Sequence, residues 1–270
     1  MAKSNVQGMR LVAEALRRSR RGEPVTPQIR ALMIYLHSAE LRPASVIDTD
    51  ANAIVLDLGS SSEFLAGLPE GSGAEWLTAG IRRQMQAADT AFAYGRYGEP
   101  RALYDNDHFA GNAGGSGERR TVHMGIDLFC AAGTIIRAPL DGVVHRVANN
   151  ERELDYGPML VLRHDSGDGQ YFHTLFGHLL LSSVQELIAG QRVAAGDPIA
   201  AVGRPPENGN WPPHLHFQLI LDLLDLGSEF PGVCRASECD LWLSLSPSPA
   251  MFFPNVPADR LDFASDSSVR

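Results

Sequence analysis

A run of short apolar segments, each ended by Gly, Pro or Asp, fills residues 121–224 and most constrains how this chain can fold. The segments read TIIRAPL, VVHRV, MLVLRH, QYFHTLFGHL and HLHFQLIL. Their length and the density of turn residues between them are typical of strands in an antiparallel sheet or barrel. Asp141-Gly142, between the first two segments, predicts a hairpin turn. The 26 glycines and 17 prolines of the chain also favour a turn-rich β fold over a helical bundle.

The first 95 residues carry helical patterns and no catalytic spacing. Apolar residues on one face predict a helix over residues 6–20. Pro27, directly after Thr26, is typical of the start of a second helix. Ser72 and Glu75 have capping-box spacing, which predicts that a third helix begins near Ser72. A short stretch between these helices, AIVLDL, is typical of a strand or extended chain.

These patterns divide the chain into three predicted parts. Residues 1–95 form a helical N-terminal region, residues 96–225 a β-rich domain, and residues 226–270 an extension with a polar tail. The expected fold class is therefore α+β overall, with a mainly β core. For Glu99 and Arg101, near the start of the β-rich domain, a buried ion pair and a cover over a cleft are both compatible with the sequence.

Charge and composition argue against several partners. The net charge is −9 and no Lys/Arg-rich face is evident, so we expect no nucleic-acid partner. No apolar run approaches the length that spans a bilayer, so we expect no membrane partner. The first ten residues lack a secretion signal, which predicts a cytoplasmic location. Three cysteines make no disulfide framework, and the CxxxxC spacing of Cys234 and Cys239 lacks the second pair of a zinc knuckle.

Histidines concentrate in three short motifs of the β-rich domain. They are HMGID, which begins at His123, FGH, which ends at His178, and HLH, which begins at His214. On a strand, side chains two residues apart point to the same face, so His214 and His216 share one cleft. One of the two can bind a metal ion while the other stands beside it as an acid, a base or a hydrogen-bond donor.

The HMGID motif can supply two further ligands. On a straight strand His123 and Asp127 would lie about 13 Å apart, which is too far for one metal ion. Gly125 between them permits a turn or bulge that brings both side chains together. With one histidine of the HLH motif they make three protein ligands and leave a position for water, which is the arrangement of a catalytic zinc site.

The order of these motifs resembles that of the LytM/lysostaphin-type zinc metallopeptidases. That family is marked by an HxxxD motif, a later aromatic-Gly-or-Ala-His motif and a terminal HxH motif. Residues 121–219 read HMGID, FGHL and HLHF at those places, and they also contain the segment AGTIIRAPLDGVV, which resembles the hairpin of the family. The resemblance implies a lysostaphin-type, antiparallel and barrel-like core with Zn²⁺ as cofactor.

The same resemblance implies a role for each residue of the motifs. His123, Asp127 and His216 map onto the zinc ligands, and His178 and His214 map onto the two catalytic histidines. The implied reaction is attack of a zinc-polarised water on the carbonyl of a peptide or other amide. Because the chain has no HExxH motif, no helix-borne glutamate base is available. We expect His214 to orient or deprotonate the water, and His178 to hydrogen-bond the oxyanion or protonate the leaving amine.

Two features set the chain apart from the family pattern. Gln218 stands where an acid is common, and the ENGN loop before the HLH motif is unusual; we expect both to change the cleft wall and not the metal ligands. Residues 43–258 also resemble the middle region of fusion proteins that join a kinase-like phosphotransferase domain, a LytM-like domain and a class III aminotransferase. That likeness keeps a second function open: a non-catalytic zinc-binding scaffold beside adjacent enzyme domains.

A carrier function is a third possibility. The segment APLDGVV resembles the hairpins of lipoyl and biotinyl domains, which need an exposed lysine for their cofactor. Residues 121–224 contain no lysine, and this excludes a carrier.

Overall fold

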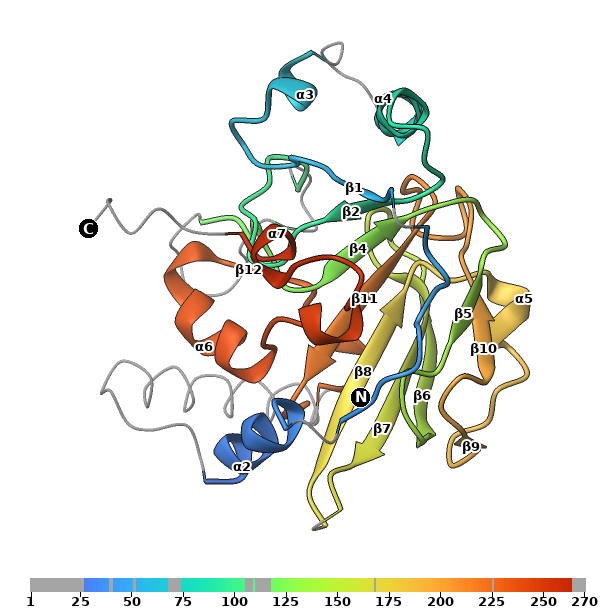
Figure 1. Ribbon diagram of the computed structural model, residues 1–270, viewed down its shortest axis with the longest axis vertical. Coiled ribbons are helices and arrows are strands. Elements are labelled where there is room, and N and C mark those ends of the chain that lie inside the picture. Colours follow the sequence, from blue (N-terminus) through green and yellow to red (C-terminus); the bar gives the residue numbers. More distant parts are fainter. Residues whose placement is uncertain are drawn as a thin grey trace.

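The computed structural model describes residues 27–38, 41–50, 52–67, 74–104, 109, 118–167, 169–224 and 226–263. Its centre is an eight-stranded sheet in the order β1-β2-β4-β11-β8-β7-β6-β9 (Figure 1). In that order the strands are β1 (Ile54–Val55), β2 (Ala93–Gly95), β4 (Ile126–Phe129), β11 (His214–Ile220), β8 (Tyr171–Gly177), β7 (Gly157–Asp165), β6 (Gly142–Asn150) and β9 (Arg192–Val193). Only β1 and β2 pair in parallel; the other neighbours in this sheet are antiparallel. The predicted mainly β core is thereby confirmed.

Two short sheets and several helices complete the described chain. β5 (Ile135–Arg137) pairs with β10 (Pro198–Ala201), and β3 (Val122–His123) pairs with β12 (Val233–Cys234). The α-helices are α2 (Pro27–Leu36), α3 (Glu63–Ala66), α4 (Ala74–Ala87), α5 (Leu181–Val184), α6 (Cys239–Leu245) and α7 (Ala258–Leu261). Figure 1 shows α3 and α4 beyond the β1 and β2 edge of the large sheet. Among the described helices, none is both long enough and apolar enough to cross a bilayer.

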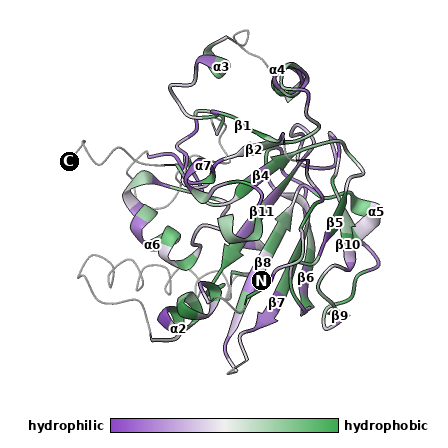
Figure 2. Cartoon of the chain, viewed as in Figure 1, coloured by the Kyte–Doolittle hydropathy of each residue, from purple (hydrophilic) through white to green (hydrophobic). Residues whose placement is uncertain are grey.

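The core fills both faces of the central strands. All seven residues of β11 are buried, and hydrophobic residues run along the strands of the large sheet (Figure 2). Phe217 of β11 packs edge-on against Phe176 of β8, with ring centroids 5.2 Å apart. Burial of such aromatic and aliphatic surface is the main stabilising term of a sheet core, about 25 cal/mol for each Å² removed from water.

The predicted N-terminal elements have three outcomes. The second and third predicted helices are confirmed as α2 and α4, and the predicted extended stretch contains β1. Ile29, Leu32 and Leu36 of α2 are buried in the main core, as their spacing on one helix face requires. Leu77 and Ile81 of α4 are buried in a second cluster, which also holds Phe129 of β4. The helix predicted over residues 6–20 and the cap predicted at Ser72 lie outside the described residues.

The predicted hairpin at Asp141-Gly142 is wrong. β5 pairs with β10, and β6, which begins at Gly142, pairs with β7 and β9. The chain after β5 stays beside residues 194–197, because Ala138 N donates to Asp197 O at 2.9 Å and Gly196 N to Ala138 O at 2.8 Å. Asp141 Oδ1 accepts from Ala195 N at 2.8 Å. Its side chain therefore binds the segment of residues 194–197 and does not form a hairpin turn.

The segment after β11 packs against the sheet. Trp242 of α6, Phe252, Phe253 and Leu261 are all buried in the same core as the central strands. Ser246, directly after α6, is completely buried and donates through Oγ to Leu219 O of β11 at 2.8 Å. The C-terminal segment therefore contributes side chains to the core that positions the histidine motifs.

Candidate metal centre

Three side chains meet where the ends of β3, β4 and β11 come together. Asp127 and His216 face each other in the register of β4 and β11, and His123 is the last residue of β3, three residues before β4 begins. Gly125 lies in this break, and a Cβ atom there would come within 2.6 Å of the His216 ring. The glycine is therefore required because the backbone passes directly beside a ligand side chain.

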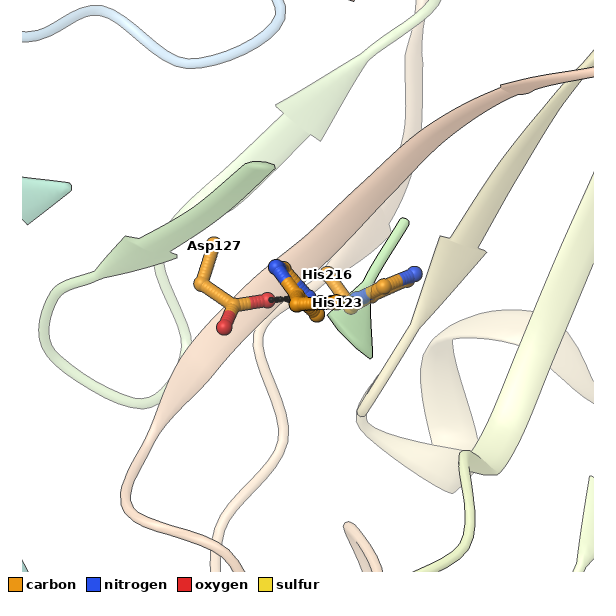
Figure 3. Close-up of side chains that lie close together, drawn as sticks. All are labelled: His123, Asp127 and His216. Carbon is orange, nitrogen blue, oxygen red and sulfur yellow. Dashed lines mark hydrogen bonds and ion pairs between the residues drawn. The ribbon is translucent and has the colours of Figure 1, made fainter. Parts of the chain in front are cut away.

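The donor atoms of His123, Asp127 and His216 form one compact cluster (Figure 3). Asp127 Oδ1 lies 3.1 Å from His123 Nε2 and 3.2 Å from His216 Nδ1, and these two nitrogens lie 2.9 Å apart. The three residues are between 1 and 3% exposed. One ion in the middle of this cluster would be within reach of all three donors.

Hydrogen bonds on the outer side of each ring decide which nitrogens carry protons. His123 Nδ1 lies 3.0 Å from Arg96 O, a carbonyl that can only accept, so Nδ1 carries the proton. His216 Nε2 lies 3.0 Å from Gln218 Oε1. The amide of Gln218 is oriented by Pro231 O, which accepts from its Nε2 at 3.2 Å. Both outer nitrogens are therefore donors, as in histidines that bind metals.

This arrangement leaves three lone-pair donors directed at one another. Burial lowers the pKa of His123 to about 4, so the ring is neutral near pH 7 and its Nε2 carries a lone pair. The inner nitrogens of His123 and His216 and the Asp127 carboxylate would repel one another, and a cation between them removes that repulsion. Two imidazole nitrogens and one carboxylate oxygen fit a divalent metal ion, and three protein donors leave a position for water.

A buried ion-pair chain holds the far oxygen of Asp127. Arg101 NH1 donates to Asp127 Oδ2 at 2.6 Å, and Arg101 Nε donates to Glu99 Oε2 at 3.0 Å. Arg96 donates to the other oxygen of Glu99 at 2.9 Å. Glu99 is completely buried and Arg101 is 3% exposed, so of the two roles compatible with the sequence the structure has the buried ion pair.

The neighbours of Asp127 keep its carboxyl group ionised. Burial by itself would raise the pKa of this carboxyl, but His123, Arg101 and His214 together hold it well below its usual range. Asp127 is therefore ionised near pH 7, and it contributes a full negative charge to the cluster.

His178 and His214 form a second pair beside the cluster, with ring centroids 4.3 Å apart. His214 Nδ1 lies 2.6 Å from Pro212 O and His178 Nδ1 lies 2.9 Å from Asn208 O, so each ring carries its proton on the outer side. Both Nε2 atoms are left with a lone pair, and that of His214 lies 3.7 Å from Asp127 Oδ1. Burial lowers the pKa of both rings, which keeps them neutral near pH 7.

The backbone of His178 is held in an uncommon conformation. Its φ is 63°, in the left-handed region that costs free energy for a residue with a Cβ atom. Two hydrogen bonds fix it: His178 N donates to Tyr156 O, and Gly203 N donates to His178 O, both at 2.8 Å. This turn, directly after β8, directs the ring into the same cleft as the cluster.

All five residues singled out in the sequence line one cleft, together with aromatic side chains. Tyr104, Phe109, Tyr156 and Trp211 form much of the wall, and Arg120 and Arg152 also line it. Trp211 packs edge-on against both His178 and His214, at centroid distances of 6.2 and 6.3 Å. These aromatic side chains had no pattern that pointed to the site.

The expectation for Gln218 is wrong. The side chain is completely buried behind His216, bonded to its Nε2, and it does not line the cleft. The change at this position therefore bears on a proposed metal ligand and not on the cleft wall. Strand periodicity carried the signal, because Gln218 follows His214 and His216 at a spacing of two on β11.

Comparisons with known proteins found one curated relative and several solved structures to which the chain is similar. A curated relative from Haemophilus influenzae, named "Uncharacterized metalloprotease", is 35% identical over 100 residues, which are 37% of this chain. The chain spans about a fifth of that relative, because the match covers 19% of its length. The catalytic domain of lysostaphin from Staphylococcus simulans is 25% identical, with 42% of this chain and 74% of that one covered and a TM-score of 0.31. For LytU the identity is 28%, the coverage 50% and 86%, and the TM-score 0.32.

The family comparison is the more specific. Residues 121–224 match the model of Peptidase family M23. That range begins two residues before His123 and ends eight residues after His216, so this M23-like segment contains all five residues of the histidine cleft.

Proposed function

We propose that the M23-like segment, residues 121–224, is a zinc-dependent metallopeptidase that hydrolyses a peptide or other amide. The observation that carries the proposal is the convergence of lone pairs from His123, Asp127 and His216, with each ring's proton on the opposite side. The match to Peptidase family M23 and the name of the Haemophilus influenzae relative support the same reaction class.

His123, Asp127 and His216 would hold the ion. Two nitrogens and one oxygen are donors that zinc accepts. A bound zinc ion supplies Lewis acidity, which lowers the pKa of a water molecule and polarises an amide carbonyl. Arg96 O, Gln218 and Arg101 keep the three ligands oriented through their outer atoms.

His214 is the proposed general base. Its Nε2 carries a lone pair, because Nδ1 donates to Pro212 O, so it can accept a proton from the attacking water. Asp127 Oδ1, 3.7 Å from Nε2, would stabilise the imidazolium that results. Stacking on Phe129, with ring centroids 4.9 Å apart, keeps the ring in this orientation.

His178 is proposed to donate a hydrogen bond or a proton to the substrate during the reaction. The ring lies 4.3 Å from His214 and is held by Asn208 O. If the proton that His214 takes from the water passes to Nε2 of His178, this nitrogen can donate to the oxyanion of the tetrahedral intermediate or to the leaving amine. The strained φ of 63° fits such a role, because strain of this kind is often found at functional sites.

Several features of the whole protein stay predictions. They are the cytoplasmic location, the boundaries at residues 95 and 225, and the fusion to phosphotransferase and aminotransferase domains. The non-catalytic scaffold is the competing function, and it would use the same metal ligands. Metal content alone does not separate the two functions, whereas turnover does.

The experiment has two stages. Metal content is measured by mass spectrometry for the wild type and for Asp127→Ala, with His37→Ala as a control because His37, directly after α2, is exposed and does not line the cleft. We expect about one zinc per chain in the wild type and in His37→Ala, and none in Asp127→Ala. The zinc-loaded protein is then incubated with a mixture of peptides, and the products are identified by their masses.

The outcomes separate the two functions. Cleavage that is lost in Asp127→Ala and kept in His37→Ala supports the peptidase. Stoichiometric zinc without cleavage of any peptide or amide favours the scaffold. If the wild type binds no zinc even when zinc is supplied, both functions are wrong.

A further inference from the structure

Two cysteines outside the cleft lie in contact with each other. Cys234 ends β12 and Cys239 begins α6, and their sulfur atoms lie 3.3 Å apart. Cys239 Sγ also donates to Arg235 O at 3.3 Å. Cys130, the third cysteine, is buried and has neither of the other two as its partner. The sulfur atoms of a disulfide lie about 2.0 Å apart, so a small side-chain movement would join Cys234 to Cys239.

The turn between the two cysteines is held at several points. Arg235 donates through Nε to Glu118 O at 3.1 Å and through NH1 to Glu238 Oε1 at 2.9 Å. Ser237 N donates to the Glu118 carboxylate at 3.0 Å, and Trp242 Nε1 donates to Glu238 Oε2 at 3.1 Å. These bonds connect the turn to Glu118 and to Trp242 of α6, and none of them is covalent.

The two thiols differ in access. Cys234 is 1% exposed, whereas Cys239 is only partly buried. The contact with Cys234 lowers the pKa of Cys239, because the neighbouring thiol hydrogen-bonds to its thiolate. The same contact raises the pKa of Cys234. Cys239 is thus the thiol that an oxidant in solution reaches, and Cys234 is the one positioned to react second.

We propose that Cys234 and Cys239 are a redox-sensitive modification site, at which a small-molecule disulfide converts the two thiols into a reversible intramolecular disulfide. The Cys239 thiolate attacks one sulfur of the oxidant and expels the first small thiolate. The Cys234 thiolate then attacks the Cys239 sulfur of the mixed disulfide and expels the second. Two protons leave the protein, the two cysteines are oxidised, and the small disulfide is reduced to two thiols.

The site lies beside the candidate metal centre but does not depend on the proposed function. Val233, the residue before Cys234, pairs with His123 in the register of β12 and β3. At the far end of α6, Ser246 Oγ accepts from Gln218, the partner of His216. A disulfide would therefore join β12, the strand paired with His123, to α6. This helix leads to Ser246, the partner of Gln218, and Gln218 in turn hydrogen-bonds to His216.

The test uses the whole wild-type protein and oxidised glutathione, and it requires no activity. After excess reagent is removed, the protein is alkylated and digested with trypsin, which cuts after Arg235 and separates the two cysteines. We expect one new species, in which the peptide that ends at Arg235 is disulfide-linked to the peptide that contains Cys239. Dithiothreitol should return both peptides, and Cys130 should not react.

Variants test the order of the two steps. Cys234→Ser should accumulate the mixed disulfide of glutathione on Cys239, because no second thiol can expel it. Cys239→Ser should remain largely unmodified, and Cys130→Ser should behave as the wild type does. The proposal is overturned if the wild type retains glutathione on Cys239 without forming the linked peptides, if it forms only disulfide-linked dimers, or if Cys239 does not react. The wild-type peptide map decides the matter even if a serine variant fails to fold.

Discussion

Arg101 binds the one oxygen of Asp127 that faces away from the histidine cluster. Its NH1 donates to Oδ2 at 2.6 Å, while Oδ1 lies 3.1 Å from His123 Nε2. Both side chains are almost completely buried, so this ion pair is not screened by solvent. The pairing orients the carboxylate and leaves a single oxygen for a metal ion.

Replacing Arg101 should therefore affect stability and metal binding together. In Arg101→Met the buried charges of Glu99 and Asp127 lose their shared partner, and removing one member of a buried ion pair costs about 3–5 kcal/mol. We expect the free energy of unfolding of the metal-free protein to fall by that amount in urea titrations. Arg152→Met is the control, because Arg152 is exposed at the mouth of the same cleft.

A second variant separates charge from packing. Arg101→Met combined with Glu99→Gln removes one of the two carboxylates that lose Arg101 as a partner, so part of the lost stability should return. If the single variant loses less than about 1 kcal/mol, as surface ion pairs do, then the chain of ion pairs does not support Asp127 as we infer.

Gln218 should tune metal affinity without touching the ion. Its Oε1 accepts from His216 Nε2, and loss of such outer partners weakens metal binding by about 10–100-fold. We expect Gln218→Met to show a decrease of that size in zinc affinity, measured by competition with a chelator. Near-ultraviolet circular dichroism should stay unchanged, which distinguishes weaker binding from unfolding. An unchanged affinity in a folded variant would show that Gln218 only fills space.

The alternation of side chains along a strand made one part of the site predictable, the pair His214 and His216. His214 and His216 are two residues apart on β11, and residues 121–224 carried enough turn residues to predict the sheet. What sequence reasoning left open or predicted wrongly elsewhere depends on contacts that are distant in sequence, unlike the Gln218 contact two residues from His216. Arg101 binds Asp127 from 26 residues away, and no periodicity reports such a pair. The turn chemistry of Asp141-Gly142 was overridden in the same way by residues 194–197.

Acid should destabilise the metal-free protein through a histidine outside the cleft. His164 is 1% exposed, and burial lowers its pKa from 6.5 to about 4. The unfolded state then binds more protons than the folded state between these values. The stabilising contribution of His164 is fully present above pH 6.5 and is lost as the pH falls towards 4. At 1.36 kcal/mol for each pKa unit, the loss amounts to about 3 kcal/mol.

The measurement compares unfolding of wild type and His164→Gln at several pH values between 7 and 4. Glutamine cannot titrate, but it can still hydrogen-bond to Asp141 O and Thr174 Oγ1, the two partners of the His164 ring. We expect the variant to lose less stability than the wild type as the pH falls through this window. Parallel curves would mean that His164 is not the group whose protonation matters.

The roles of His216 and His178 can be told apart by one comparison of metal content and turnover. His216 belongs to the three-donor cluster, whereas His178 lies one ring further away, 6.1 Å from His216 between centroids. We expect His216→Ala to lose zinc, and His178→Ala to keep zinc while peptide cleavage falls at least 100-fold, the usual lower bound for a lost proton-transfer group. Equal zinc loss in both variants would place His178 among the ligands and would contradict its proposed role in proton transfer.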